Sequence, residues 1–87
     1  MNAENPFTTR TQVRYRLEQA GNVALAVYNV QGVRLTTFAN AQQGVGDHTA
    51  TWNGTNAEGQ DVPSGTYFIV VFVNERQAGE VKVMKVR

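Results

Sequence analysis

The sequence predicts an all-β domain, an antiparallel β-sandwich of six to seven short strands. Three observations favour this fold class: apolar and polar residues alternate with the two-residue period of strands, turn signals recur at short intervals, and no window shows a helical period. With 87 residues, the chain is long enough for one small domain with a single hydrophobic core.

The N-terminal residues predict a lead-in followed by a strand. Residues 1–10 have no strand pattern and are expected to be a lead-in or linker, so the domain itself would cover residues 11–87. Over residues 12–17, the alternation puts Val13, Tyr15 and Leu17 on one face. The opposite face carries two arginines, which favour a position at the edge of a sheet because charge discourages further strand pairing.

The next segment predicts a hairpin. Residues 23–30 are apolar on both faces, which indicates a strand inside a sheet. The turn at residues 29–32 contains Gly32, which can adopt a positive φ angle, and it leads to a strand over residues 33–38. Residues 39–46, rich in Asn, Gln and Gly, are expected to form a loop.

Two more strands flank a long polar loop. Residues 47–52 alternate as a strand, and the loop that follows contains the Asn-Gly turn signal at Gly54. Pro63 and Gly65 fit the type I turn pattern of Pro at the second and Gly at the fourth position. Residues 66–73 are apolar on both faces and predict a central strand.

Residues 80–87 predict the last strand. Two valines fall on one phase of its alternation, while Met84 and Val86 fall on the other, which indicates a β-bulge near Val83 and Met84. Such a bulge would turn Lys85 and Arg87 outward. The number and length of the expected strands are typical of an Ig-like sandwich with Greek-key connections, with a small barrel as the alternative.

Composition excludes several classes of function. The chain has no cysteine, a single histidine (His48) and a single serine (Ser64), so it offers no thiolate nucleophile, no multi-histidine metal site and no recognisable catalytic triad. The net charge of +1 is too small to indicate the basic surface that nucleic-acid-binding domains have. No apolar run is long enough to span a membrane. We therefore expect neither an enzyme nor a cofactor.

Two binding chemistries remain open at this point. Asn53, Asn56, Glu58 and Asp61 offer oxygen ligands for calcium within one loop, although their spacing is not that of an EF-hand. The aromatic residues lie in expected strands, where core packing is the usual role, and only a flat exposed row of them would indicate carbohydrate binding.

An ordered set of motifs supports a family resemblance. The motifs are Asn5-Pro6-Phe7, the strand of residues 13–17, the strand and turn of residues 23–32, the sequence from Gly46 to Gly54 that contains Trp52-Asn53-Gly54, the hairpin signal of residues 59–68, and a basic last strand that ends on Arg87. Together they resemble the C-terminal sorting domain of the type IX (Por) secretion system of Bacteroidetes. More distantly, they are similar to the Ig-like domain of flagellar hook-capping proteins.

The resemblance implies a function that composition alone does not. It implies a non-catalytic C-terminal secretion signal and cell-surface attachment module of a larger secreted protein, often a hydrolase, with the cargo domain on its N-terminal side. The partners would be an outer-membrane translocon and a sortase-like peptidase, and the protein would pass through the periplasm to the cell surface. Two alternatives are a carbohydrate-binding accessory module of a secreted glycoside hydrolase and a protein-assembly Ig-like module.

The last strand is the expected recognition element. Lys82, Lys85 and Arg87 are the candidate partner-recognition side chains, and we expect the strand itself to be read through main-chain pairing by a partner. Gly32, Gly54, Pro63 and Gly65 are expected to form the turns that define the fold. No metal ligand set is expected.

Overall fold

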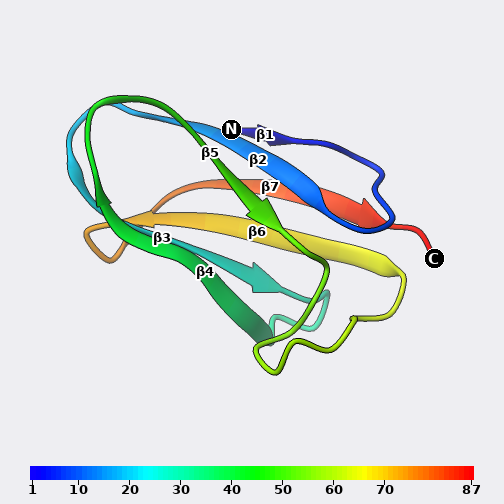
Figure 1. Cartoon of the computed structure of the whole chain (residues 1–87). Coiled ribbons are helices and arrows are strands. Elements are labelled where there is room, and N and C mark those ends of the chain that lie inside the picture. Colours follow the sequence, from blue (N-terminus) through cyan, green and yellow to red (C-terminus); the bar gives the residue numbers. More distant parts are fainter.

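A computed structural model describes all 87 residues as two β-sheets packed face to face (Figure 1). One sheet has the strand order β1-β2-β5 and the other β4-β3-β6-β7, and all the paired strands are antiparallel. No helix is present, and so none that could cross a membrane. The predicted antiparallel sandwich is confirmed. Its strands are β1 (Asn2–Ala3), β2 (Thr11–Leu17), β3 (Gly21–Tyr28), β4 (Arg34–Gln43), β5 (Gly46–Trp52), β6 (Gly65–Val73) and β7 (Arg76–Lys85).

The core lies between the two sheets and has an aromatic end around Trp52. The Trp52 ring meets the rings of Phe7 and Tyr67 edge to face, with centroid separations of 5.6 and 5.4 Å. The indole N–H donates a hydrogen bond to the Thr55 carbonyl, and the Tyr67 hydroxyl donates one to the Pro63 carbonyl. Like these two, every other buried side-chain nitrogen or oxygen atom has a hydrogen-bond partner.

The first long strand has the predicted faces but not the predicted position. Val13, Tyr15 and Leu17 are buried, as the alternation indicates. However, β2 is not an edge strand, because it lies between β5 and the two-residue strand β1. β1 pairs only with Val13 and Arg14 of β2. The edge strand of this sheet is therefore the two-residue β1 and not β2.

The two doubly apolar strands lie inside the four-stranded sheet, as predicted. β3 pairs with β4 and β6, and β6 pairs with β3 and β7. The turn between β3 and β4 is also confirmed: the Asn29 side chain accepts hydrogen bonds from the amides of Gln31 and Val33, and Gly32 has φ 82°.

The expected loop over residues 39–46 is mostly strand. β4 continues to Gln43 because a bulge at Ala39, with φ 56°, absorbs the irregular residues. The register changes there from Leu25 opposite Phe38 to Val23 opposite Ala41. Polar composition alone predicted a loop because the second half of β4 is exposed and has no apolar alternation.

Residues 1–10 differ from the expected lead-in. Phe7 is only 5% exposed and belongs to the hydrophobic core. The carbonyl of Glu4 accepts a hydrogen bond of 2.6 Å from the Thr11 hydroxyl, and that threonine is fully buried. This segment therefore packs as part of the sandwich.

The predicted bulge near Val83 and Met84 is wrong. The pairing of β6 with β7 is regular from Gly65 opposite Lys85 up to Val71 opposite Gly79, and the irregularity follows at Ala78. Asn74 and Glu75, both with positive φ, form a tight turn before β7 begins.

Candidate interaction surfaces

The three predicted recognition cations do not lie on one surface. Lys82 and Arg87 are exposed, but Lys85 is 5% exposed and its ammonium group donates a hydrogen bond of 2.7 Å to the Val62 carbonyl. The outward orientation predicted for Lys85 is therefore wrong. The last strand has no bulge at Val83, so Lys85, two residues further along, points toward the core as Val83 does.

Lys85 instead connects the last strand to the loops that the turn residues form. Gly54 has φ 71°, and a Cβ atom there would lie 3.0 Å from the Lys85 side chain and 3.3 Å from the Thr9 carbonyl. The bend that contains Pro63 and Gly65 lacks the hydrogen bond of a closed type I turn. Its carbonyl groups accept hydrogen bonds from buried side chains instead, Pro63 from the Tyr67 hydroxyl and Val62 from the Lys85 ammonium group.

The outer edge of β7 is already paired within the chain. The Asn5 side chain donates to the Lys82 carbonyl at 3.2 Å and accepts from the Met84 amide at 2.8 Å. The Phe7 amide donates to the Met84 carbonyl, and the Val86 amide donates to the Phe7 carbonyl. We call residues 5–7 the N-terminal clamp. Because the clamp occupies the main-chain groups from Lys82 to Val86, the end of this strand is not free to pair with a partner.

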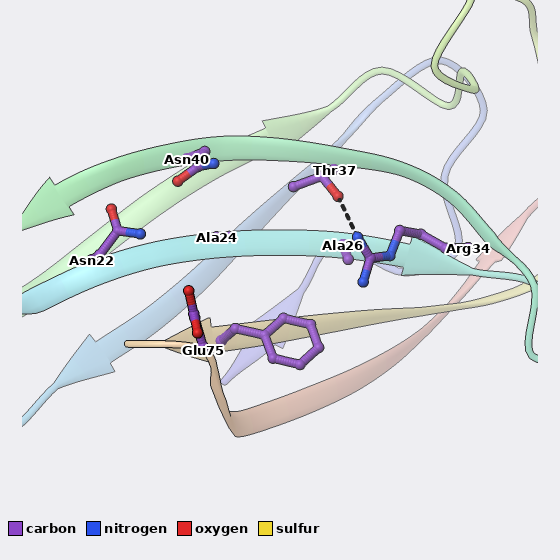
Figure 2. A pocket seen from close by; sticks show the side chains of 8 residues that line it. Asn22, Ala24, Ala26, Arg34, Thr37, Asn40 and Glu75 are labelled. Atoms are coloured by element: carbon purple, nitrogen blue, oxygen red, sulfur yellow. Dashed lines mark hydrogen bonds between the residues drawn. The ribbon is translucent and has the colours of Figure 1, made fainter.

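A shallow groove of about 450 Å³ crosses the outer face of the four-stranded sheet (Figure 2). Its floor is made by Ala24 and Ala26 of β3, whose side chains are small; Ala24 is half-buried, and Ala26 is buried beneath its neighbours. Arg34 lies toward one end, 3.5 Å from the Thr37 hydroxyl and stacked over the Tyr28 ring. The groove is further lined by Asn22, Asn40, Phe72 and Glu75.

The aromatic residues do not form a flat exposed row. Trp52, Tyr15 and Tyr67 are buried in the core. Tyr28 of β3 lies opposite Phe68 of β6, on the outer face of the sheet, and both are half-buried. This face therefore offers partly covered rings beside the groove.

The remaining polar candidates are occupied by local contacts. The His48 ring is hydrogen-bonded to the Gly44 carbonyl at 2.7 Å and stacks on the Tyr15 ring. Asn56, one of the loop residues with oxygen ligands for calcium, uses its side-chain oxygen to accept the amides of Glu58 and Gln60. No group of three or more acidic or histidine residues that could hold a metal ion is present.

The fold and these surfaces define an Ig-like β-sandwich whose candidate sites are sheet edges and one groove. Residues 4–77 match the family described as the FlgD Ig-like domain, and the chain belongs to this family. No curated protein sequence gives a significant match.

Two solved structures show the same fold. The FlgD structure from P. aeruginosa has a TM-score of 0.71 and 22% sequence identity over 84% of this chain. FlgD from Xanthomonas campestris, whose structure is described as giving insights into the hook capping essential for flagellar assembly, has a TM-score of 0.70 and 20% identity over 94% of this chain. In each case the match covers 59% of the FlgD chain, so this chain corresponds to part of those proteins.

The clamp is the feature that sequence reasoning missed. Asn5 and Met84 are 79 positions apart in the chain, so no local pattern links them. The one signal in the sequence is the asparagine before Pro6, and the motif Asn5-Pro6-Phe7 does not indicate which strand its side chain contacts.

Proposed function

We propose that this domain is a non-catalytic protein-binding module that joins a larger protein to a protein assembly. The observation that carries the proposal is membership of the FlgD Ig-like family, together with likeness to a FlgD that takes part in hook capping. The surfaces are consistent with it, because the conspicuous features of the chain are sheet edges and a groove that suit contacts with another polypeptide.

Deletion of the domain from its parent protein tests this proposal. We expect the parent to remain folded and soluble but to be lost from its assembly, as measured by quantitative immunoblotting of the isolated assembly. A parent that enters the assembly normally without the domain would contradict the proposal. Retardation of the isolated domain in gels containing polysaccharide would favour the carbohydrate-binding alternative instead.

A second candidate is the C-terminal sorting signal of type IX secretion. One observation favours it. The first and the last motif of the sorting-domain resemblance, Asn5-Pro6-Phe7 and the last strand, are hydrogen-bonded to each other in the structure. The partners would then be the outer-membrane translocon and a sortase-like peptidase, and the cargo would lie on the N-terminal side. Lys82 and Arg87 would remain the exposed cations for recognition.

A reporter fusion separates the two candidates. A fluorescent protein fused before residue 1 is expressed in a host with a type IX system and in the same host without its translocon. Translocon-dependent appearance of the reporter at the cell surface supports the sorting signal. Retention of the reporter in both strains would exclude it and leave the assembly module.

A further inference from the structure

We propose that the outer edge of β5 pairs with the same edge of a second copy of this chain, antiparallel and centred on Thr49. The two three-stranded sheets would then join into one sheet of six strands. This inference deepens the proposed function and rests on it, because it names the surface and the partner through which the module assembles.

Three of the four outer sheet edges are protected against pairing. β1 has only two residues. β4 has two register irregularities, and the carbonyl of Leu35 near its start is taken by the Ala57 amide. β7 is closed by the N-terminal clamp at one end and has a bulge at Ala78 near the other. Short strands, bulges and covering segments are the usual ways in which proteins prevent edge pairing.

β5 has none of these protections. It is a regular seven-residue strand that pairs with β2 without a register shift, and it contains neither proline nor lysine. No turn, loop or side-chain hydrogen bond reaches its main chain. Asp47 is its only acidic residue, and the Arg16 guanidinium already pairs with that carboxylate at 3.1 Å.

The register shows which main-chain groups of β5 are free. The Gln12 carbonyl accepts the Glu4 amide, so Gln12 directs its main-chain groups away from β5. Because successive residues of a strand alternate in this respect, its neighbour Val13 directs its groups toward Ala50, its partner in β5. The outward groups of β5 therefore belong to Asp47, Thr49 and Thr51.

These three positions complement themselves. In an antiparallel pair centred on Thr49, that residue meets its own copy, and Asp47 meets Thr51 of the second chain. No like charges face each other, and threonine pairs are favourable across strands. On the inner face, His48 and Ala50, both half-buried, would face each other's copies and become covered. Since a seven-residue strand pair is smaller than a standard interface, we expect association at high protein concentration only.

Disulfide trapping tests both the pairing and its register, because the chain contains no cysteine. In the proposed pair, the Cα atoms of residue 49 in the two chains lie about 5.5 Å apart, within the range that a disulfide spans. The control Thr51→Cys puts its two Cα atoms about 14 Å apart, since position 51 and its own copy are offset by four residues along the strands and also lie on neighbouring strands. We expect Thr49→Cys to form covalent dimers about tenfold faster than Thr51→Cys under mild oxidation.

Light scattering of the 87-residue chain supplies an independent readout without cysteine. The mean mass of the wild-type chain is expected to rise with concentration, and Thr49→Lys should abolish the rise because two lysines would face each other. Gln42→Lys, which adds the same charge at an exposed position of β4 outside the groove, is the matched control and should leave the rise unchanged. Near-ultraviolet circular dichroism confirms that each variant is folded.

Equal trapping rates for the two cysteine variants, or a mass that stays monomeric at all concentrations, would overturn the self-pairing. These outcomes are separate from the fate of the proposed function. If the domain deletion abolishes assembly while self-pairing fails, the function stands and another surface carries it. If self-pairing is observed but the deletion leaves assembly intact, the assembly function falls.

Discussion

β7 and β5 are both edge strands of antiparallel sheets, but the outer main-chain groups are hydrogen-bonded at the end of β7 and unpaired along β5. β7 is closed by the N-terminal clamp, whose hydrogen bonds cover the main chain from Lys82 to Val86. β5 presents regular unpaired groups to solvent. The basic last strand is the most conspicuous strand in the sequence, but the main-chain groups at its end are already hydrogen-bonded within the chain. β5, whose outer face carries Thr49 and Thr51, is the strand whose edge is free to pair with a partner.

The closed edge depends most strongly on Phe7. Its ring is buried and packs edge to face against Trp52, so Phe7→Ala is expected to cost about 3–5 kcal/mol in the free energy of unfolding. Urea denaturation followed by Trp52 fluorescence measures the change. Thr49→Ala on the open edge is the contrast and should stay within about 0.5 kcal/mol. Equal costs for the two variants would contradict the claim that only one edge is structural.

The two lysines of β7 make a second contrast. Lys85 buries its stem and donates to the Val62 carbonyl, so Lys85→Ala should destabilise the fold by about 2 kcal/mol through lost packing and an unsatisfied carbonyl. Lys82 is exposed, and Lys82→Ala should change stability by less than about 0.5 kcal/mol. Thermal unfolding of both variants checks this. If Lys82→Ala lost more stability than Lys85→Ala, the inward orientation of Lys85 would be wrong.

The side chain of Asn5 contributes to the closed edge through two hydrogen bonds. Asn5→Ala is expected to cost about 1 kcal/mol, because water can replace part of what is lost at this exposed site. Asn5→Asp keeps the acceptor for the Met84 amide and loses the donor to the Lys82 carbonyl. It should therefore retain slow hydrogen exchange at Met84, whereas Asn5→Ala should not. Unchanged exchange in Asn5→Ala would contradict the role of the clamp.

The smallest expected effect is on pH dependence. Burial raises the pKa of the Tyr67 hydroxyl above its ordinary value of 10.0. The folded state therefore holds this proton more tightly than the unfolded state. Its contribution is fully present below pH 10 and is lost as the pH rises through the folded-state pKa. Unfolding experiments at alkaline pH should show a shallower loss for Tyr67→Phe than for the wild type, and identical slopes would contradict this assignment.

Local patterns in the sequence were sufficient for much of the fold. Alternation predicted the inward face of β2, apolar residues on both faces predicted the central positions of β3 and β6, and the turn residues predicted the hairpin at Gly32. Alternation failed for β7, where apolar residues occur on both phases and the exposed Met84 and Val86 resemble a second core face. A strand with two apolar faces does not reveal which one is buried until its partner and register are known.

The candidate surfaces could be predicted less well, because they arise from contacts between distant parts of the chain. The pairing of Asn5 with β7 joins the two ends of the sequence, and the burial of Lys85 depends on the carbonyl of Val62. The open edge of β5 follows from topology alone, since an edge strand and a central strand with the same alternation cannot be distinguished by residue type.

Amide hydrogen exchange of the monomer, followed residue by residue by NMR, tests the contrast between the edges most directly. At low protein concentration, we expect slow exchange at Met84 and Val86 of the closed edge and fast exchange at Asp47, Thr49 and Thr51 of the open edge. Raising the concentration should slow the exchange of the β5 amides only. Exchange at Met84 and Val86 as fast as at Thr49 would contradict the account.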